Sequence, residues 1–150
     1  MKRAVTVLIV IGLLTGAAIA AVSLSATSVR INIPFAFHAG DQLMPAGEYW
    51  IELPNSSTLA TGSMVRVASL DASLCQYLFS SPVVSMAKDT DWHLTFSKIG
   101  DQYFLATIRN SEVGAALPKS RSEKALAREY ATGNTEAAVV HLIAHVRKGK

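Results

Sequence analysis

Two histidines near the end of the 150-residue chain, His141 and His145, have a spacing that binds metal when it occurs on a helix. Four residues apart on a helix, two imidazoles project from one face and can both coordinate zinc. On a strand the same spacing separates them by about 13 Å. The apolar, β-branched sequence Val139–Ile143 favours a strand, and no acidic residue lies between the histidines as a metalloprotease motif requires. We therefore expect no metal site here.

The other polar residues lack the pattern of a catalytic or cofactor site. No serine has the flanking glycines of a nucleophile elbow, and His38 and His93 are too far away in sequence to be assigned to a shared site. Asp89-Thr90-Asp91 begins like a calcium loop but lacks the glycine and the terminal glutamate. The glycines and aspartates fit predicted turns instead: Gly40, Gly47, Gly100, Gly114, Asp71, Asp89, Asp91 and Asp101. We predict that the protein is not an enzyme and holds no metal or cofactor.

The only cysteine, Cys75, excludes an intrachain disulfide and a cysteine-ligated zinc site. In an oxidising compartment a lone thiol is either buried in the core or paired between chains. Because Cys75 lies between Leu74 and the sequence Gln76-Tyr77-Leu78, we expect it to be buried.

The first 25 residues have the composition of a signal peptide. Lys2 and Arg3 precede an apolar stretch, Ala4 to Ala21, which small residues follow. Cleavage sites fit at both Ala18-x-Ala20 and Ser23-x-Ser25, and the alternative is an uncleaved anchor, since about 18 apolar residues can just span a bilayer. No cysteine follows the stretch, which excludes a lipoprotein anchor. We expect a secreted or periplasmic bacterial protein.

Without this segment the chain is nearly neutral. The full chain has a formal charge of +3 and is 50% hydrophobic, and the first 25 residues contribute strongly to both. Lys2 and Arg3 are two of 14 basic residues, which leaves 12 against 11 acidic ones. There is no basic patch with interleaved aromatic residues, so nucleic acid is not an expected partner. Residues 26–150 are predicted to form a single β-rich domain.

From residue 29 onward, short alternating runs separated by turn signals are typical of an antiparallel β protein. Val29–Ile33 is the first strand, and Phe37 is expected to continue its apolar face past Pro34, which places the strand at an edge or a bulge. Pro45-Ala46-Gly47 forms a turn with a left-handed glycine before the strand Glu48–Leu53. These two strands are predicted to form a hairpin.

The remaining strands follow the same rules. They are predicted at Met64–Leu70, Leu74–Phe79 with an end or bend at Ser81-Pro82, Trp92–Ser97, Tyr103–Arg109 with Phe104, Ala106 and Ile108 on one face, and Ala138–Val146. Trp92–Ser97 and Tyr103–Arg109 form a second hairpin around Gly100-Asp101, and Ala138–Val146 closes the sheet.

One helix interrupts this pattern at residues 120–131. Ser120 and Glu123 make a capping box at its start, and Gly133-Asn134 ends it. The predicted fold is therefore all-β: a small antiparallel β-sandwich or barrel of about seven to eight strands with one helix toward the C-terminus.

Trp50 is the residue whose placement bears most directly on function. Alternation puts Tyr49, Ile51 and Leu53 on one face, so Trp50 shares the opposite, wetter face with Glu48 and Glu52. Trp50, Glu48 and Glu52 are the candidate partner-facing residues, or else Trp50 lines a barrel lumen. Trp92 shares a face with Leu94 and Phe96 and is expected in the core.

Three stretches of the chain form a combined pattern: Ile33–Gly40 leading to Met44–Tyr49, then Gly100–Leu105, then Leu117–Glu123. Together they resemble a family of small secreted proteins of unknown function from Acidobacteria and similar soil bacteria. The resemblance covers most of the chain after the signal peptide and implies a bacterial exported protein without an established activity. Met44 replaces a usual leucine, and His38 and Cys75 do not belong to the pattern.

Two functions fit these features. The first is a non-enzymatic binding or structural module of the cell envelope or extracellular space, whose partner is a protein or an envelope component. The alternative is a small β-barrel carrier of an apolar ligand. A binding module needs a filled interior and an exposed aromatic patch, whereas a carrier needs an apolar cavity.

Overall fold

The computed structural model describes residues 26–54, 63–84, 90–132 and 138–144, so the expected signal peptide, Asp89, Gly133-Asn134 and His145 lie outside the described residues. The strands are β1 (Ala26–Ile33), β2 (Phe37–Ala39), β3 (Gln42–Met44), β4 (Gly47–Pro54), β5 (Ser63–Ser69), β6 (Cys75–Val83), β7 (Trp92–Ile99), β8 (Gln102–Arg109), β9 (Gly114–Ala116) and β10 (Ala138–Ala144). The helix is α2 (Arg121–Thr132). For the described residues the all-β prediction with one helix is confirmed, and three strands of three residues each join the seven longer ones there.

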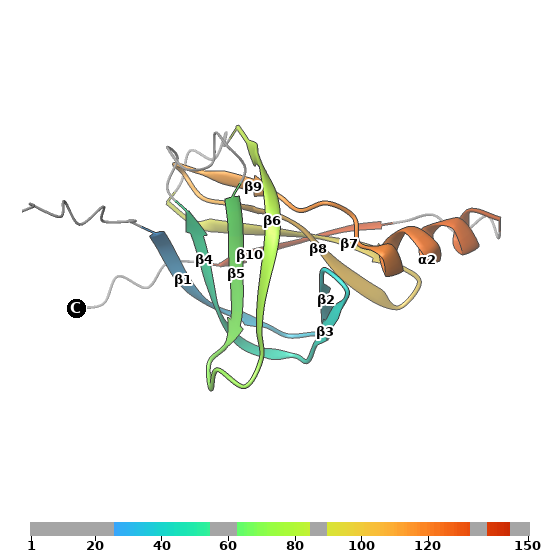
Figure 1. Ribbon diagram of the computed structural model, residues 1–150, viewed down its shortest axis with the longest axis horizontal. Coiled ribbons are helices and arrows are strands. Elements are labelled where there is room, and N and C mark those ends of the chain that lie inside the picture. The colour runs from blue at the N-terminus through green and yellow to red at the C-terminus, as the bar shows by residue number, and fades with distance from the viewer. Residues whose placement is uncertain (1–25, 55–62, 85–89, 133–137, 145–150) are drawn as a thin grey trace, which may run out of the picture.

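The strands form two layers that share β6. The ladder runs β1-β4-β5-β6-β9-β8-β2-β3, and a second branch adds β7 and then β10 beside β8. Figure 1 shows β4, β5 and β6 running steeply across β7, β8 and β10. The first six residues of β6, Cys75 to Ser80, pair with β5, whereas Ser81–Val83 pairs with β9. The predicted break at Ser81-Pro82 is thus the point where one strand passes between layers.

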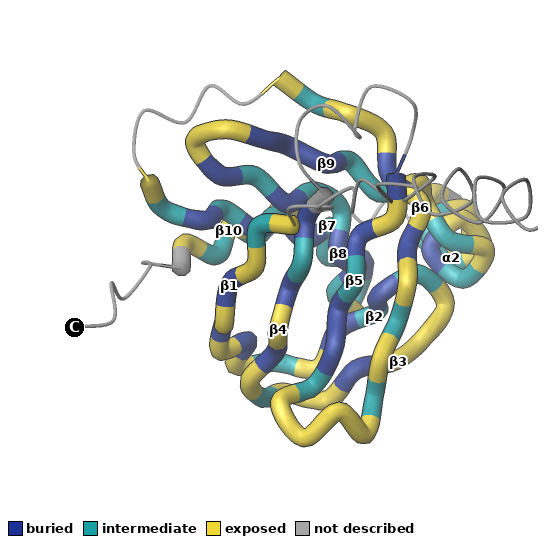
Figure 2. The backbone as a smooth tube through the Cα atoms, turned by 60° about the vertical axis from the view of Figure 1, so that its left-hand side comes forward, coloured by how far each residue is buried: buried dark blue, intermediate teal, exposed yellow. Residues whose placement is uncertain are grey.

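Aromatic rings from both layers fill the space between them. The ring of Phe37 lies 5.2 Å from that of Tyr49 in β4 and 5.6 Å from that of Phe96 in β7, both edge to face. Trp92 is 3% exposed, as its alternation predicts. Figure 2 shows buried positions alternating along β1, β4 and β5, which is the two-residue period of strands with one face on a core.

The first hairpin forms as predicted, but its strands are not joined by a single turn. β1 pairs with β4 from Ala26↔Pro54 to Ile33↔Gly47, and β1 lies at the edge of the sheet. Phe37 does not continue β1, because the chain leaves the strand at Pro34 and Phe37 begins β2, which pairs with β3 and β8. Gly47 is not left-handed; among glycines, positive φ angles occur at Gly40 and Gly100 within the described residues.

The second hairpin, β7 with β8, contains a β-bulge that changes which residues face the core. Thr95 pairs with Thr107 but Phe96 pairs with Leu105, so Ala106 is an extra residue. Leu105 and Ile108 therefore face the core, and Phe104, predicted on the same face as Ile108, is buried elsewhere under the ring of His38. A bulge inverts the alternation, which a sequence pattern does not reveal.

Helix α2 starts at the predicted capping serine. The Glu123 N–H donates a hydrogen bond of 3.1 Å to the Ser120 hydroxyl. The return bond from the glutamate is not made by its Oε1, which is buried without a hydrogen-bond partner in the described residues. Asp41 supplies a further cap, since it accepts hydrogen bonds from the N–H and hydroxyl of Ser122 at 3.1 and 2.8 Å. The helix is thereby attached to the β2–β3 turn.

The last strand extends the second layer without closing the molecule into a barrel. β10 pairs with β7, and no pairing joins it to β1 in the described part of the chain. None of the described helical residues form a helix long and apolar enough to cross a membrane.

Candidate interaction surface

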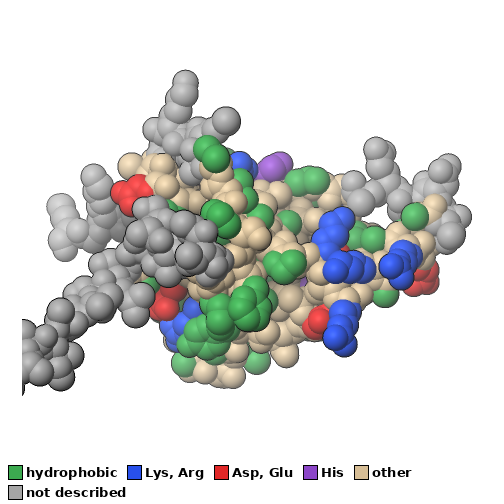
Figure 3. Space-filling model, turned by 45° about the horizontal axis from the view of Figure 1, so that its top comes forward, with side chains coloured by type: hydrophobic (Ala, Val, Ile, Leu, Met, Phe, Trp, Pro, Cys, Tyr) green, Lys and Arg blue, Asp and Glu red, His purple; other side chains and the backbone are tan. Residues whose placement is uncertain are grey.

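The outer face of β4, β5 and β6 carries large apolar side chains. Cross-strand pairs place Met64 beside Phe79, and Arg66 beside Tyr77. The exposed fractions are 39% for Trp50, 46% for Met64, 57% for Tyr77 and 74% for Phe79. Hydrophobic side chains gather on one side of the molecule in Figure 3. We call Trp50, Met64, Arg66, Tyr77 and Phe79 the aromatic face.

Trp50 lies where the alternation of β4 predicts, outward between Glu48 and Glu52. Its neighbour Ile51 is fully buried. Ala68, directly opposite Trp50 on β5, is only 1% exposed although it belongs to the outer face. The indole and the neighbouring side chains therefore cover the middle of the sheet and leave part of the ring available to a partner.

Both glutamates beside Trp50 form cross-strand ion pairs. Arg66 Nη1 donates to Glu52 Oε1 at 2.7 Å, and Arg30 pairs with Glu48. The Cys75 side chain, and then the Glu52 carboxylate, raise the pKa of the Arg66 guanidinium. A charged Arg66 with its stem beside Tyr77 gives the face a fixed cation among aromatic rings. Glu52 orients this cation and Glu48 is paired with Arg30, so the two glutamates do not form a separate acidic site.

Cys75 is exposed, so the prediction of burial is wrong. β6 has apolar residues on both faces. Leu78, which is 8% exposed and points inward, shows which of its alternating positions face the core. Cys75, three residues earlier, consequently points outward with Tyr77 and Phe79. Hydrophobic neighbours do not fix the direction of a side chain in a strand that is apolar on both faces.

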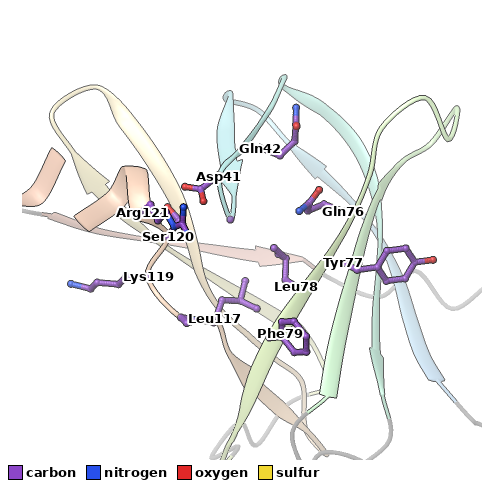
Figure 4. A pocket seen from close by; sticks show the side chains of 12 residues that line it. Asp41, Gln42, Gln76, Tyr77, Leu78, Phe79, Leu117, Lys119, Ser120 and Arg121 are labelled. Carbon is purple, nitrogen blue, oxygen red and sulfur yellow. The ribbon is translucent and has the colours of Figure 1, made fainter. Parts of the chain in front are cut away.

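A groove of about 470 Å³ lies on the other side of β6, between this strand, the β2–β3 turn and the segment that leads into α2. Figure 4 shows Leu78 and Leu117 approaching each other across its floor, with Gln76 pointing from β6 toward the turn that holds Asp41. The residues lining the groove are Gly40, Asp41, Gln42, Gln76, Tyr77, Leu78, Phe79 and Leu117 to Arg121.

The groove opens because β9 leaves β6 after three residues. Ser81↔Ala116 is the last pair of their ladder, and continuing it would place Pro118, which has no N–H, opposite Phe79. The Leu117 N–H donates a hydrogen bond of 2.8 Å to the Ala106 carbonyl, so the chain stays paired with β8 as it leaves β6. Gly114 allows β9 to lie close to β6 where the two strands pair, because a Cβ on Gly114 would lie 2.7 Å from the Val83 carbonyl oxygen. Its role is close approach of two strands and not the predicted turn.

The electrostatics of this groove are set by the start of α2. The hydrogen bonds from the Ser122 N–H and hydroxyl lower the pKa of Asp41, so this residue is a carboxylate already engaged as a cap. Lys119 and Arg121 are exposed beside it. Figure 3 shows further Lys and Arg side chains at the same end of the molecule, with Asp or Glu side chains beside them, and α2 carries Glu123 and Glu129 as well as Lys124 and Arg128. Among the residues that line the groove, the two cations outnumber the one carboxylate.

The histidines considered for metal binding are dispersed. His38 stacks on Phe104 with ring centroids 4.7 Å apart, and its Nδ1 is buried without a partner in the described residues. His141 is exposed on β10, where its Nδ1 lies 3.4 Å from the Thr95 hydroxyl. Across the described ranges, no group of three His, Cys, Asp or Glu side chains is arranged to hold a metal ion.

The aspartates and glycines expected in turns are mostly found there. Asp71 accepts a hydrogen bond from the Ser73 N–H at 3.1 Å, which stabilises the β5–β6 turn, and Asp101 lies in the β7–β8 turn. Gly40 and Gly100 have φ angles of 65° and 59°. The groove beside β6 was not predicted, and Pro118 two residues after β9 is the one sequence signal that marks it.

No family model, curated protein or solved structure matches this chain. The fold and its surfaces define a small two-layered β domain with aromatic side chains both between its layers and on one outer face.

Proposed function

We propose that the protein is a non-enzymatic binding module of the bacterial cell envelope or extracellular space, and that it binds a protein partner through the aromatic face. The exposed cluster of Trp50, Tyr77, Phe79 and Met64 around Arg66 carries this proposal. Trp, Tyr, Met and Arg are the residue types enriched at the centres of protein–protein interfaces, and rigid aromatic side chains lose little conformational entropy on binding. The cross-strand ion pair to Glu52 holds Arg66 in place before a partner arrives.

The interior supports a binding module over the alternative, a carrier of an apolar ligand. A carrier uses inward-facing side chains from several strands to line a cavity. Here Phe37, Tyr49 and Phe96 meet in the middle, and all three are fully buried. Four of the large apolar side chains that are accessible, Trp50, Met64, Tyr77 and Phe79, lie together on the outside of β4, β5 and β6.

Export by a signal peptide in the first 25 residues completes the proposal. The basic start, the apolar stretch and the small residues at its end support it, as does the resemblance to exported proteins of soil bacteria. Secreted protein is expected to have lost residues 1 to about 20 or 25. An intact mass that retains Met1 or Lys2 would overturn this part.

The partner is identified by comparing three forms of the mature protein as bait. The wild type, a Trp50→Ala/Tyr77→Ala variant, and a Val139→Ala/Ile143→Ala control are immobilised and exposed to envelope and culture fractions of the source bacterium. Val139 and Ile143 are 61% and 53% exposed on β10, so the control removes similar apolar exposure elsewhere.

The proposal expects a protein retained by the wild type and the control but reduced at least about tenfold on the aromatic-face variant, a typical loss for interface anchors. Binding must be reproduced with the two purified proteins by calorimetry. Identical retention by all three baits contradicts the proposal. An apolar small molecule released from the protein in native mass spectrometry would favour the carrier instead.

A further inference from the structure

The first six residues of β6 have an open edge that faces the groove. Residues Cys75 to Ser80 pair with β5 on one side, whereas β9 pairs only with Ser81 to Val83 on the other. Elsewhere in the described residues no strand pairs with this part of β6. Six residues of strand extend about 20 Å. An open edge of this length displays backbone donors and acceptors that can pair with another strand.

The register shows which backbone groups point into the groove. The Ser69 N–H donates to the Leu74 carbonyl at 2.8 Å, which makes this pair a hydrogen-bonded one at the end of the β5–β6 ladder. In an antiparallel ladder, hydrogen-bonded and non-hydrogen-bonded pairs alternate. Gln76 and Leu78 are therefore bonded to β5, whereas the N–H and C=O groups of Tyr77 and Phe79 point away from it, toward the groove.

The residues that line the groove beside this edge supply an apolar floor and charged side chains. Leu78 and Leu117 form an apolar floor, which suits alternate side chains of an added strand that point inward. The lining on the other side contains two basic residues, Lys119 and Arg121, and one acidic residue, Asp41, whose carboxylate accepts hydrogen bonds from Ser122; Figure 4 shows the Lys119 side chain directed away from β6. The excess of positive charge favours an acidic ligand over a basic one.

We infer that this groove binds an extended, acidic peptide segment of a partner protein, which adds to the open edge of β6 as a new strand. The segment carries apolar residues at alternate positions that face Leu78 and Leu117, and acidic residues between them. This mode of recognition is β-strand addition, in which backbone hydrogen bonds provide affinity and alternate side chains provide specificity. The inference goes beyond the proposed function, because it uses the backbone edge of β6 and not the side chains of the aromatic face.

The test uses the mature protein and a fluorescein-labelled peptide, acetyl-(Glu-Val)3-amide, in fluorescence polarisation. In an antiparallel pairing with β6, which is the more stable pairing per residue, the glutamate N–H groups face β6 when the valines face the floor, because directly opposite residues then bond to each other and point to the same face of the sheet. N-methylation of the three glutamate nitrogens should weaken binding at least about tenfold, since several backbone hydrogen bonds are lost. The (Lys-Val)3 peptide should also bind at least about fivefold more weakly, with a difference that shrinks at high salt.

Two variants of the protein locate the site. Phe79→Pro removes the N–H that faces the groove while leaving the N–H groups that bond to β5, and Phe79→Ala removes only the side chain. Peptide binding should fall at least about tenfold in Phe79→Pro and stay within about threefold in Phe79→Ala. Circular dichroism checks that both variants fold. If Phe79→Pro does not fold, binding of the N-methylated peptide to the wild-type protein is the test of the inference.

Several outcomes would overturn the inference. They are absence of binding by the acidic peptide, equal binding of its N-methylated form, or a dimer of the protein that forms through this edge and is abolished by Phe79→Pro. Trp50→Ala should leave peptide binding unchanged. Failure of the strand addition is therefore distinguishable from failure of the aromatic face as an interface.

Discussion

The hydroxyl of Ser69 donates a hydrogen bond of 2.6 Å to Oδ1 of Asp71 across the turn between β5 and β6. The same oxygen accepts hydrogen bonds from the N–H and hydroxyl of Ser73 at 3.1 and 2.8 Å. These bonds, that from Ser69 first, lower the pKa of Asp71 from 3.8 to about 2. Asp71, which the sequence predicts to cap the backbone of its turn, therefore also makes contacts whose strength depends on pH.

Asp71→Asn should remove this pH dependence from the stability of the protein. The pKa is lower in the folded state than in the unfolded chain, so the carboxylate stabilises the fold fully above pH 3.8, and this stabilisation is lost as the pH falls through about 2. The difference in unfolding free energy between wild type and Asp71→Asn should therefore shrink across this window in urea titrations. A constant difference would contradict the assignment. Asp101→Asn, at another exposed turn, is the control.

Truncating neighbouring residues of β4 should have very different effects on stability. Ile51 is fully buried, so Ile51→Ala should cost about 2 to 5 kcal/mol, the usual range for a buried aliphatic side chain. Trp50 is 39% exposed, and Trp50→Ala should cost about 1 kcal/mol or less. Denaturant unfolding measures both. If Trp50→Ala lowered the unfolding free energy more than Ile51→Ala does, Trp50 would be a core residue and would not belong to the aromatic face.

Cys75 should react fully in the native protein, because its side chain is exposed at the start of β6. Iodoacetamide is expected to modify one thiol per chain without denaturant, as measured by intact mass. Cys75→Ser should change the unfolding free energy by no more than about 0.5 kcal/mol. Modification that requires denaturant would restore the interpretation of a buried thiol. Without reductant, the exposed thiol should also give a disulfide-linked dimer that Cys75→Ser abolishes.

Gly100→Ala should destabilise the contact between the β7–β8 turn and α2. Gly100 has a φ of 59°, and a Cβ there would lie 2.3 Å from the Tyr130 hydroxyl oxygen. The left-handed conformation costs an alanine about 1 to 2 kcal/mol, and displacement of Tyr130 adds to this. A double-mutant cycle with Tyr130→Ala separates the two effects: the cost should fall by about 1 kcal/mol when the ring is absent. An unchanged cost would mean that Tyr130 moves away freely.

The local structure of this protein can be predicted from its amino-acid pattern. Alternation identified the seven longer strands and the inward positions of Ile51 and Trp92, because a strand with one buried face must repeat every two residues. The Ser120 cap located the start of the helix, because its hydroxyl satisfies a first-turn N–H regardless of the rest of the chain. Trp50 was found by the same means, as the apolar exception on a polar face.

Features that depend on a partner strand far away in the chain could not be predicted in this way. The direction of Cys75 depends on which face of β6 meets the core, and the bulge at Ala106 depends on the register of β8 against β7. The groove exists because Leu117 bonds to β8 and Pro118 cannot pair with Phe79, more than thirty residues away. Such pairings are chosen by backbone hydrogen bonds and packing in three dimensions, which side-chain periodicity within one segment does not encode.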